Sequence, residues 1–544
     1  MGQPIEGAYD VVVAGSGAAG LSAALSAAKA GLKVVILEKS DKLGGGTSVS
    51  HGGIWVGKNH LASAAGYADS RDDILAYMRF VGGDQIREDN MVAYVDWSPR
   101  VLTILEDWGL KFSVLKGVSD HYFPIAPGSK EAGRTIEPAL ISANDLGELK
   151  DAVFLPPNEV VEVCSAESIA WGGMSNLAGW DGALIEERRK QRICGRGVAL
   201  VTHFLKALKK EDVEIVRGAG VDRLVVTDGA VSGVVLSSGM VLHASKAVIL
   251  ATGGYESNPD LVAVHEGLPR WQSMFPESLT GDGMIMASEL GAAVRTIHNN
   301  MALFLGFVVP PKTANDMPFY RMAGITELLF PHTLVVNRKG RRFADETYFQ
   351  SMAPRLREYE PATHSFSNLP CYLVFDSQFQ RRFSFAGNAP GAAIPDWVAC
   401  ADTIEELAAK LDVDAAGLAE TVARYNGFAA TGVDEDFKRG AQKWSLAKKD
   451  SWGAEGLPNP SVGAVSQGPF YGIELHPSAF CSAGLVTNPD AQVLNQRGHP
   501  ISGLYAVGNA SAHTDYGVGY QAGYSLASAM TFGYLAARHV AQTR

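Results

Sequence analysis

The feature that most constrains this chain is a glycine turn between two apolar runs near the N-terminus. Residues 9–13 form the first run, which ends at a GxGxxG turn over 15–20, and an Ala- and Leu-rich stretch follows over 21–29. A second apolar run stops at Glu38, about twenty residues after the turn, where a dinucleotide fold places its ribose-binding acid. Strand, glycine turn, helix and strand together predict a dinucleotide site.

Each glycine of the turn has a physical role. Gly15 permits the tight turn, Gly17 lets a pyrophosphate approach the backbone, and Gly20 lets helix and strand pack closely. The start of the helix offers unpaired N–H groups and a partial positive charge to the phosphates. A glycine-dense loop that follows Glu38 can approach the cofactor without interference from side chains. The first part of the predicted cofactor site comprises Gly15, Gly17, Ala18, Ala19, Gly20, Glu38, Lys39, Gly45, Gly46, Thr47, Ser48, Gly52 and Gly53.

Bulk properties exclude several classes of function. A chain of 544 residues is too long for one core, so two or more domains are expected. The net charge of −11 argues against nucleic acid as a partner. Five cysteines at wide spacings without a CxxC predict neither a disulfide framework nor a metal site. The N-terminus lacks a secretory signal and no run of eighteen apolar residues occurs, so a cytoplasmic location is expected, with a peripheral membrane contact left open.

The order of motifs predicts the domain organisation. A long mixed segment over about 56–190 interrupts the dinucleotide pattern, which favours FAD over NAD because a flavoprotein must cover the isoalloxazine ring. Strand signals resume over 214–250, with a hairpin turn at Asp228-Gly229. The prediction is an α/β fold: a Rossmann-like FAD-binding domain with an inserted α+β substrate (cap) domain. The expected boundaries are 1–291 and 467–544 for the FAD-binding domain and 292–466 for the cap.

Several motifs together resemble a known flavoprotein superfamily. They are Gly15-x-Gly17-x-x-Gly20, Glu38-Lys39, Gly44-Gly45-Gly46-Thr47, Ala251-Thr252-Gly253-Gly254, Thr280-Gly281-Asp282-Gly283, the stretch 337–343, Arg424-Tyr425-Asn426 and the stretch 503–509. This set is similar to the superfamily of fumarate reductases, succinate dehydrogenases and 3-ketosteroid dehydrogenases. The resemblance implies FAD and adds to the cofactor site Ala251, Thr252, Gly253, Gly254, Asp282, Gly508, Asn509, Ser525 and Leu526.

Within that superfamily the chain looks most like the ketosteroid dehydrogenases. The stretches 51–56, 120–138 and 529–534 are similar to that branch. The cationic positions of the fumarate reductases are filled here by Leu329, by a residue near Phe480, and by Tyr520. A dicarboxylate would be poorly compensated in such a site. The histidine that holds flavin covalently in the respiratory enzymes would fall near Gly46, so the resemblance implies non-covalent FAD.

The resemblance also assigns catalytic roles. Desaturation of a ketone next to its carbonyl removes an α-proton and a β-hydride, so donors must polarise the carbonyl oxygen. Tyr520 and the backbone N–H of Gly523 match the family's donors. A tyrosine of the inserted domain would be the base; we expect Tyr320, with Tyr122 as helper. The register of Tyr520 looks more like the 4,5-desaturating branch, so the position of the new double bond stays open.

The predicted function is therefore FAD-dependent desaturation of a cyclic ketone, either a 3-ketosteroid or a smaller cyclohexanone-type ring, with an external electron acceptor. A fumarate-reductase-like reductase of an unsaturated acid or enone is the alternative, and it would need Arg321 or His332 as a cationic clamp. A third hypothesis is a flavoprotein without catalytic activity. The oligomeric state is open.

Overall fold

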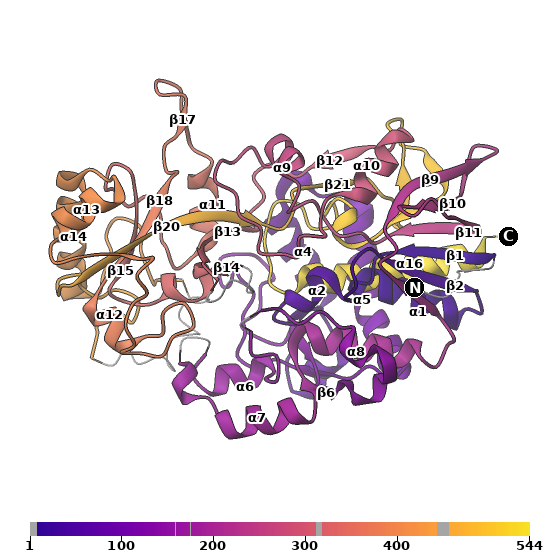
Figure 1. Ribbon diagram of the computed structural model, residues 1–544, viewed down its shortest axis with the longest axis horizontal. Helices are drawn as coiled ribbons and strands as arrows, with labels where there is room; N and C mark the ends of the chain where they lie inside the picture. Colours follow the sequence, from indigo (N-terminus) through magenta and orange to yellow (C-terminus); the bar gives the residue numbers. More distant parts are fainter. Residues whose placement is uncertain (1–7, 158, 174–175, 312–317, 443–455, 544) are drawn as a thin grey trace.

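The structure is a computed structural model that describes residues 8–157, 159–173, 176–311, 318–442 and 456–543. Two bodies share the chain (Figure 1): a dinucleotide-type sheet with its helices, and a second sheet that carries the orange helices at the left of that view. The N-terminal residues that the signal-peptide expectation used lie outside the described residues. In the part of the chain that the structure describes, no helix has both the length and the hydropathy to cross a bilayer.

The first sheet confirms the predicted dinucleotide fold. Five strands pair in parallel in the order β23, β11, β1, β2, β8. Their bounds are β1 (Tyr9–Ala14), β2 (Val34–Glu38), β8 (Glu214–Arg217), β11 (Val241–Leu250) and β23 (Pro500–Ala506). The hairpin expected at Asp228-Gly229 joins β9 (Val221–Thr227) and β10 (Ala230–Leu236). β23 returns from the far end of the chain to pair with β11, so both ends of the chain build one sheet.

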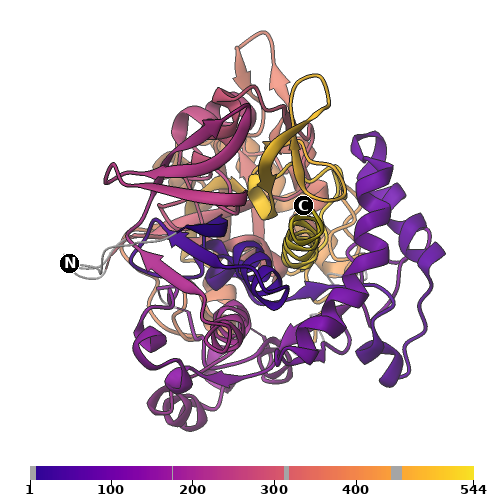
Figure 2. The same ribbon diagram turned by 90° about the vertical axis from the view of Figure 1, so that its right-hand side faces the viewer.

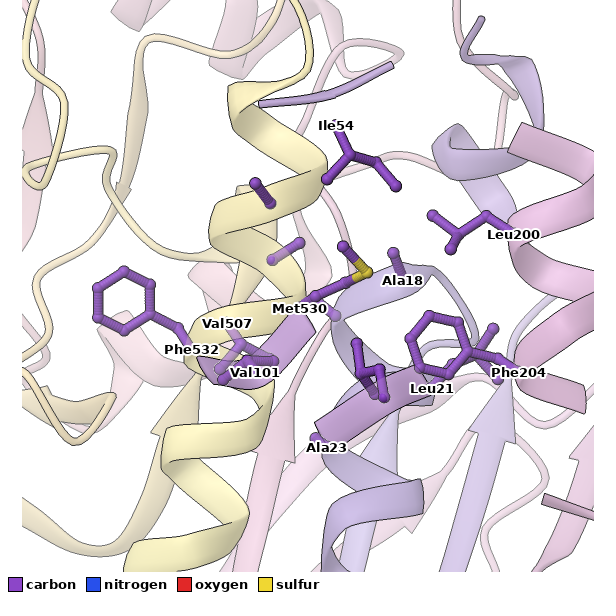
Figure 3. Close-up of a cluster of buried hydrophobic side chains, with 14 of the residues drawn as sticks. Ala18, Leu21, Ala23, Ile54, Val101, Leu200, Phe204, Val507, Met530 and Phe532 are labelled. Atoms are coloured by element: carbon purple, nitrogen blue, oxygen red, sulfur yellow. The ribbon is translucent and has the colours of Figure 1, made fainter. Parts of the chain in front are cut away.

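Two helices from opposite ends of the chain pack on this sheet. α1 (Ala18–Lys29) is rich in alanine, and α16 (Tyr524–Gln542) lies against it, with the Ser22 hydroxyl donating to the Met530 carbonyl at 2.7 Å. Figure 2 views α16 nearly along its axis beside the indigo N-terminal segment. Figure 3 shows Met530 pointing toward Ala18 at the start of α1. The small residues of α1 let α16 approach closely, so the starts of both helices lie near the same cofactor site.

The second sheet is antiparallel and runs in the order β14, β13, β20, β18, β15. Its strands are β13 (Leu303–Val309), β14 (Phe319–Met322), β15 (Thr333–Asn337), β18 (Cys371–Asp376) and β20 (Phe470–Ala479), with β19 (Ala399–Ala401) beside β20. Two helices, α13 (Ile404–Leu411) and α14 (Ala415–Thr431), share a buried hydrophobic cluster with β15 and β18. Because β20 pairs with both β13 and β18, we propose to move the second domain boundary from 466 to after Ala479.

The remaining elements cover these two bodies. The other helices are α2 (Gly45–Val49), α3 (His60–Ala64), α4 (Arg71–Gly82), α5 (Glu88–Asp107), α6 (Ser165–Ala170), α7 (Gly182–Lys190), α8 (Arg196–Leu208), α9 (Pro259–His265), α10 (Asp282–Glu289), α11 (Phe349–Leu356) and α12 (Ser377–Arg382). The other strands are β3 (Ile54–Trp55), β4 (Phe112–Val114), β5 (Thr135–Pro138), β6 (Ile141–Ser142), β7 (Ile193–Cys194), β12 (Val294–Thr296), β16 (Tyr359–Glu360), β17 (Ser365–Phe366), β21 (Ala483–Leu485) and β22 (Gln492–Leu494). The glycine-dense segment after Glu38 was expected to be a loop throughout, but its end forms α2, because Gly44 takes a left-handed φ of +108° and starts a helical turn.

Candidate active site

The turn after β1 admits only glycine at two positions. Gly15 has a φ of +110°, and a Cβ there would lie 2.2 Å from the Ala251 carbonyl oxygen at the end of β11. A Cβ at Gly20 would lie 2.0 Å from the Gly15 oxygen. At Gly17 the nearest atom is the Thr47 hydroxyl at 3.4 Å, so the missing side chain there leaves room for a ligand at the start of α1. The tight turn expected of Gly15 and the close packing expected of Gly20 are present, and the pyrophosphate contact of Gly17 stays a prediction.

Acidic and basic side chains stand at the end of β2, as expected for the adenosine end of a dinucleotide. Glu38 is buried, and its Oε2 accepts hydrogen bonds from the Ser16 N–H at 3.1 Å and the Ser16 hydroxyl at 2.6 Å. The Lys39 ammonium contacts Asp282 Oδ2 at 3.0 Å. Asp282 begins α10, so the two segments that carry these predicted residues meet beside the glycine turn.

Some of the other predicted cofactor residues contact this turn, and others contact one another. Ala18 N–H donates to the Thr47 hydroxyl at 2.9 Å, and a Cβ at Gly508 would lie 2.9 Å from the Ala19 Cβ. Asn509 Oδ1 accepts from the Ser525 hydroxyl at 3.1 Å. A Cβ at Gly46 and one at Gly253 would both meet the side chain of Leu279. A Cβ at Gly52 would lie 2.6 Å from the Arg196 backbone, and one at Gly254 would lie 2.6 Å from the Cys481 sulfur, whereas at Gly53 the nearest atom is a methyl of Thr135 at 3.7 Å. Gly45 has open space around it, and Leu526 packs on the core of the first body.

The chemistry of this cradle fits FAD. Two hydroxyls inside it, Ser48 Oγ and Thr252 Oγ1, are buried without a hydrogen-bond partner among the described residues. A buried hydroxyl is normally satisfied, so both are suited to a polar ligand. The glycine approaches, the start of α1 and the Glu38 carboxylate supply what a pyrophosphate and a ribose require.

A cluster of aromatic rings lies where the loop before α16 meets the cap. Tyr520 stands edge-on to Phe304 with ring centroids 5.1 Å apart, and edge-on to His121 at the same distance. Phe480 stacks nearly parallel to Tyr520 at 6.1 Å. Phe304 comes from β13, and Tyr348, which joins the same cluster, precedes α11. The two bodies of the protein therefore share one aromatic wall around the Tyr520 ring.

Gly523 places the start of α16 beside this wall. It has a φ of +88°, and a Cβ would lie 2.8 Å from the backbone nitrogens of Ile54 and Trp55. The Trp55 N–H donates to the Gly523 carbonyl at 2.9 Å. β3 therefore holds the start of α16 in place, with the N–H groups of its first turn free of intrahelical acceptors.

Two further phenols, those of Tyr122 and Tyr348, lie next to Tyr520 and to each other. Their rings meet edge-on at 6.5 Å, and the Tyr122 oxygen accepts the Tyr520 N–H at 3.3 Å. Burial raises the pKa of Tyr122 to about 12, against two hydrogen bonds that lower it, from the Tyr520 backbone and from Gln350. Burial also raises the pKa of Tyr348 and of Tyr520. All three phenols are therefore neutral donors near pH 7 unless a ligand changes their surroundings.

Tyr320 is the base expected from the sequence, but its hydroxyl is bonded to a backbone carbonyl of the second sheet. It lies on β14, where its hydroxyl donates to the His476 carbonyl at 2.9 Å. Burial raises its pKa well above the ordinary value. Among the described residues no ring contact joins it to Tyr520, Tyr122 or Tyr348.

Three residues in contact with one another in this region, Tyr348, His121 and Gln350, were not among the residues predicted from the sequence. Tyr348 lies a few residues after the stretch 337–343 and immediately before an amphipathic segment. A tyrosine at the start of a helix in the cap is the sequence pattern that indicates it. His121 was inside a quoted motif, beside Tyr122. Gln350 carries no local signal, because an amide gains its role only from the partners that the fold brings to it.

The family model described as "FAD binding domain" matches residues 10–529. The chain belongs to this family. As a member of the FAD binding domain family it is an FAD-dependent oxidoreductase, as the sequence predicted, and the family match covers the turn, the cap and the start of α16 together.

Three relatives of this FAD binding domain protein are similar over nearly their whole length. A 4-oxocyclohexanecarboxylate 2-dehydrogenase of Sinomonas cyclohexanicum is 36% identical over 98% of this chain and 93% of its own. A 3-oxosteroid 1-dehydrogenase of Mycolicibacterium smegmatis is 32% identical over 98% and 97%. The crystal structure of 3-ketosteroid delta1-dehydrogenase from Sterolibacterium denitrificans, in complex with 1,4-androstadiene-3,17-dione, superposes with a TM-score of 0.87 at 28% identity, covering 99% and 100%.

Proposed function

We propose that this protein desaturates a cyclic ketone next to its carbonyl, removing an α-proton and a β-hydride. The observation that carries the proposal is the meeting of Tyr520 and the start of α16 with the phenols of Tyr122 and Tyr348 in one buried cluster. Donors on one side and proton-accepting groups on the other are what an enolising ketone requires. FAD, when bound, supplies the hydride acceptor.

The names of the two curated relatives support desaturation at this bond, between the α- and β-carbons of a ring ketone. One acts at position 2 of a ring whose carbonyl is at position 4, and the other at position 1 of a ring whose carbonyl is at position 3. In both, the named carbon is two atoms from the carbonyl carbon and is therefore the β-carbon. Both named substrates, one with a single ring and one a steroid, are within the proposed substrate class of 3-ketosteroids and monocyclic cyclohexanones.

Tyr520 and Gly523 polarise the carbonyl in this proposal. The α-proton becomes acidic only when donors stabilise the charge that develops on the carbonyl oxygen. The phenol of Tyr520 is a neutral donor because burial raises its pKa. The N–H of Gly523 adds a second donor, and the partial positive charge at the start of α16 acts in the same direction.

We infer that the proton acceptor is the pair Tyr348 and Tyr122, in place of Tyr320. The Tyr348 hydroxyl is held only by a 3.3 Å hydrogen bond to the His121 carbonyl among its described contacts, so a substrate can displace it. The Tyr122 oxygen already accepts an N–H, which favours negative charge on it. For this step Tyr348 acts as its phenolate: its own proton leaves to solvent when the bound ketone changes the surroundings that raise its pKa, and the phenolate then takes the α-proton while the Tyr122 hydroxyl donates to it. Tyr320 is instead held by the His476 carbonyl.

The alternative of an unsaturated-acid reductase finds less support. Its clamp would need Arg321 or His332. The Arg321 Nε donates to the buried Glu327 carboxylate at 2.6 Å, and His332 Nδ1 is 2.7 Å from the Ala464 carbonyl. Burial lowers the pKa of His332, so it is neutral near pH 7. Freeing either group would leave a buried partner unsatisfied.

FAD is proposed to bind non-covalently. Covalent attachment needs a nucleophilic side chain, and the position that the family resemblance assigns to it is near Gly46, whose Cβ would lie 3.4 Å from Phe275. Acid precipitation of the yellow protein should leave the flavin in the supernatant; yellow colour retained in the washed precipitate would contradict this.

The proposed activity is tested by adding ketones to the FAD-loaded protein without oxygen. A panel should contain 4-oxocyclohexanecarboxylate, cyclohexanone and a 3-oxosteroid. Loss of flavin absorbance with at least one ketone, and its recovery with a soluble external acceptor, supports the proposal. Loaded, folded protein that no ketone bleaches, but whose dithionite-reduced flavin an enoate reoxidises, would favour the alternative.

A further inference from the structure

His121 joins two separate segments that meet at the active site. Its side chain is 2% exposed, and its backbone N–H donates to Gln521 Oε1 at 2.9 Å. On the ring, Nε2 is 3.4 Å from the Ala522 N–H, which can only donate. Gln521 and Ala522 directly follow Tyr520, so this half of His121 bonds to the loop that places the Tyr520 phenol.

The other half of His121 bonds to the cap. Its carbonyl accepts the Tyr348 hydroxyl at 3.3 Å, and its ring Nδ1 is 3.0 Å from the Gln350 side-chain amide. The four polar atoms of this one residue are thus divided, two toward the Tyr520 loop and two toward the Tyr348 segment. The ring also stands edge-on to Tyr520, so its position sets the space beside that phenol.

Both ring nitrogens of His121 contact amide groups. Nδ1 lies 3.0 Å from Gln350 Nε2, and Nε2 lies 3.4 Å from the backbone nitrogen of Ala522. The tautomer decides which of the two contacts is the hydrogen bond that the neutral ring accepts, and in both tautomers the ring stands between the two segments.

The backbone beneath His121 is rigid. Asp120 accepts from Trp55 Nε1 at 2.8 Å and from Arg134 Nη1 at 2.8 Å, and both Asp120 and Arg134 are buried. Gln521 Oε1 also accepts the Tyr77 hydroxyl at 2.6 Å. Neither side of the histidine can shift without breaking buried hydrogen bonds.

We propose that His121 is a positioning residue that holds the Tyr520 loop and the Tyr348 segment at a fixed separation. The roles of those two tyrosines rest on the proposed function, but the mechanical link does not. A shift of about 1 Å between them should slow the chemical step on the order of 100-fold, because both donor and base must reach one substrate.

Three substitutions separate the two halves of the link. His121→Gln places an amide oxygen near the site of Nε2 and keeps the bond from Ala522, whereas His121→Asn places an amide near the site of Nδ1 and keeps the bond to Gln350. His121→Leu removes both. His203→Leu is the matched control, because it removes another buried imidazole. His203 lies on α8, and its Nε2 is 3.0 Å from the Ala139 carbonyl oxygen.

Hydrogen exchange of the FAD-loaded variants is the test that needs no substrate. Exchange should rise over residues 518–523 in His121→Asn, over 347–352 in His121→Gln, and over both in His121→Leu, with neither segment changed in His203→Leu. Exchange equal to wild type in His121→Leu overturns the proposal, as does the same rise in the control.

Flavin reduction by a ketone that works on the wild type is the second readout. The reduction rate should fall about 100-fold in His121→Leu, with partial recovery in both amide variants and little change in the ketone concentration that gives half the maximal rate. Loss of FAD loading with a wild-type rate in the loaded fraction would mean a purely structural role and overturn the proposal. If no ketone reduces the wild-type flavin, the proposed function fails, and the exchange pattern still decides on His121.

Discussion

The backbone N–H of Tyr520 donates to the phenol oxygen of Tyr122 at 3.3 Å, although 398 residues separate them in sequence. This bond ties the donor side of the site to the base side. It also explains why the loop before α16 cannot be considered alone: its geometry depends on the segment 120–123 and, through Tyr348, on the cap.

Removal of the Tyr520 hydroxyl should slow flavin reduction by a ketone. One donor to a developing oxyanion contributes roughly 3 kcal/mol, so Tyr520→Phe should lose on the order of 100-fold in rate, with the ring packing against Phe304 and Phe480 kept. Stopped-flow absorbance measures it. Tyr505→Phe, which removes a phenol bonded to His539 far from the site, is the matched control. A rate within threefold of wild type for Tyr520→Phe would remove Tyr520 from the mechanism.

Three phenylalanine substitutions discriminate among the possible bases. Tyr348→Phe and Tyr122→Phe should each lower the reduction rate on the order of 100-fold or more, because general-base catalysis contributes about that much. Tyr320→Phe should retain most of the rate, since its hydroxyl is satisfied by the His476 carbonyl. Exchange of the ketone α-protons with D₂O in each variant identifies the group that takes the proton. Activity lost only in Tyr320→Phe would restore the base expected from the sequence.

FAD affinity should depend on the empty space at Gly17. The backbone there is ordinary and a Cβ would meet only the Thr47 hydroxyl at 3.4 Å, so Gly17→Ala should fold. The added methyl occupies the space where a pyrophosphate approaches, and FAD should bind on the order of tenfold more weakly or worse. Flavin fluorescence titration of the stripped protein measures this. Gly427→Ala, on cap helix α14 with nothing within 4 Å, should bind FAD like wild type; equal affinity in both variants would contradict the assigned site.

Glu256 should make stability fall as pH rises. Burial raises the pKa of this carboxyl from 4.5 to about 7. The folded state thus binds the proton of Glu256 more tightly than the unfolded state does. The stability that this carboxyl contributes is therefore fully present below about pH 4.5 and is lost as pH rises through about 7. Glu256→Gln should remove that loss, worth about 3 kcal/mol, and unfold at a higher temperature than wild type at pH 8 but not at pH 4.5. Parallel melting curves for the two proteins across this range would contradict the burial argument.

The sequence predicted the parts of this protein whose physics is local. Gly15, Gly20 and Glu38 are demanded by one turn and its two strands, and the contacts at that turn are the expected ones. The residue that lies beside Tyr520 could not be chosen from the sequence, because Tyr320 and Tyr348 are both tyrosines of the inserted region. Only the tertiary fold shows that Tyr320 lies on β14 and that Tyr348 joins the cluster of Tyr520. His121 could not be assigned in advance, since its partners Gln350 and Ala522 lie 229 and 401 residues away. Likewise β20 looked like part of the C-terminal segment until its pairing with β13 and β18 was known.

The most direct test of the proposed desaturation is anaerobic flavin reduction by a ring ketone deuterated at the β-carbon. With 4-oxocyclohexanecarboxylate or a 3-oxosteroid, whichever bleaches the flavin, we expect slower reduction by the β-deuterated ketone and an enone as product. We also expect Tyr520→Phe and Tyr348→Phe both to slow the reaction. A flavin that stays oxidised with every ketone, in loaded and folded protein, would contradict the proposed desaturation.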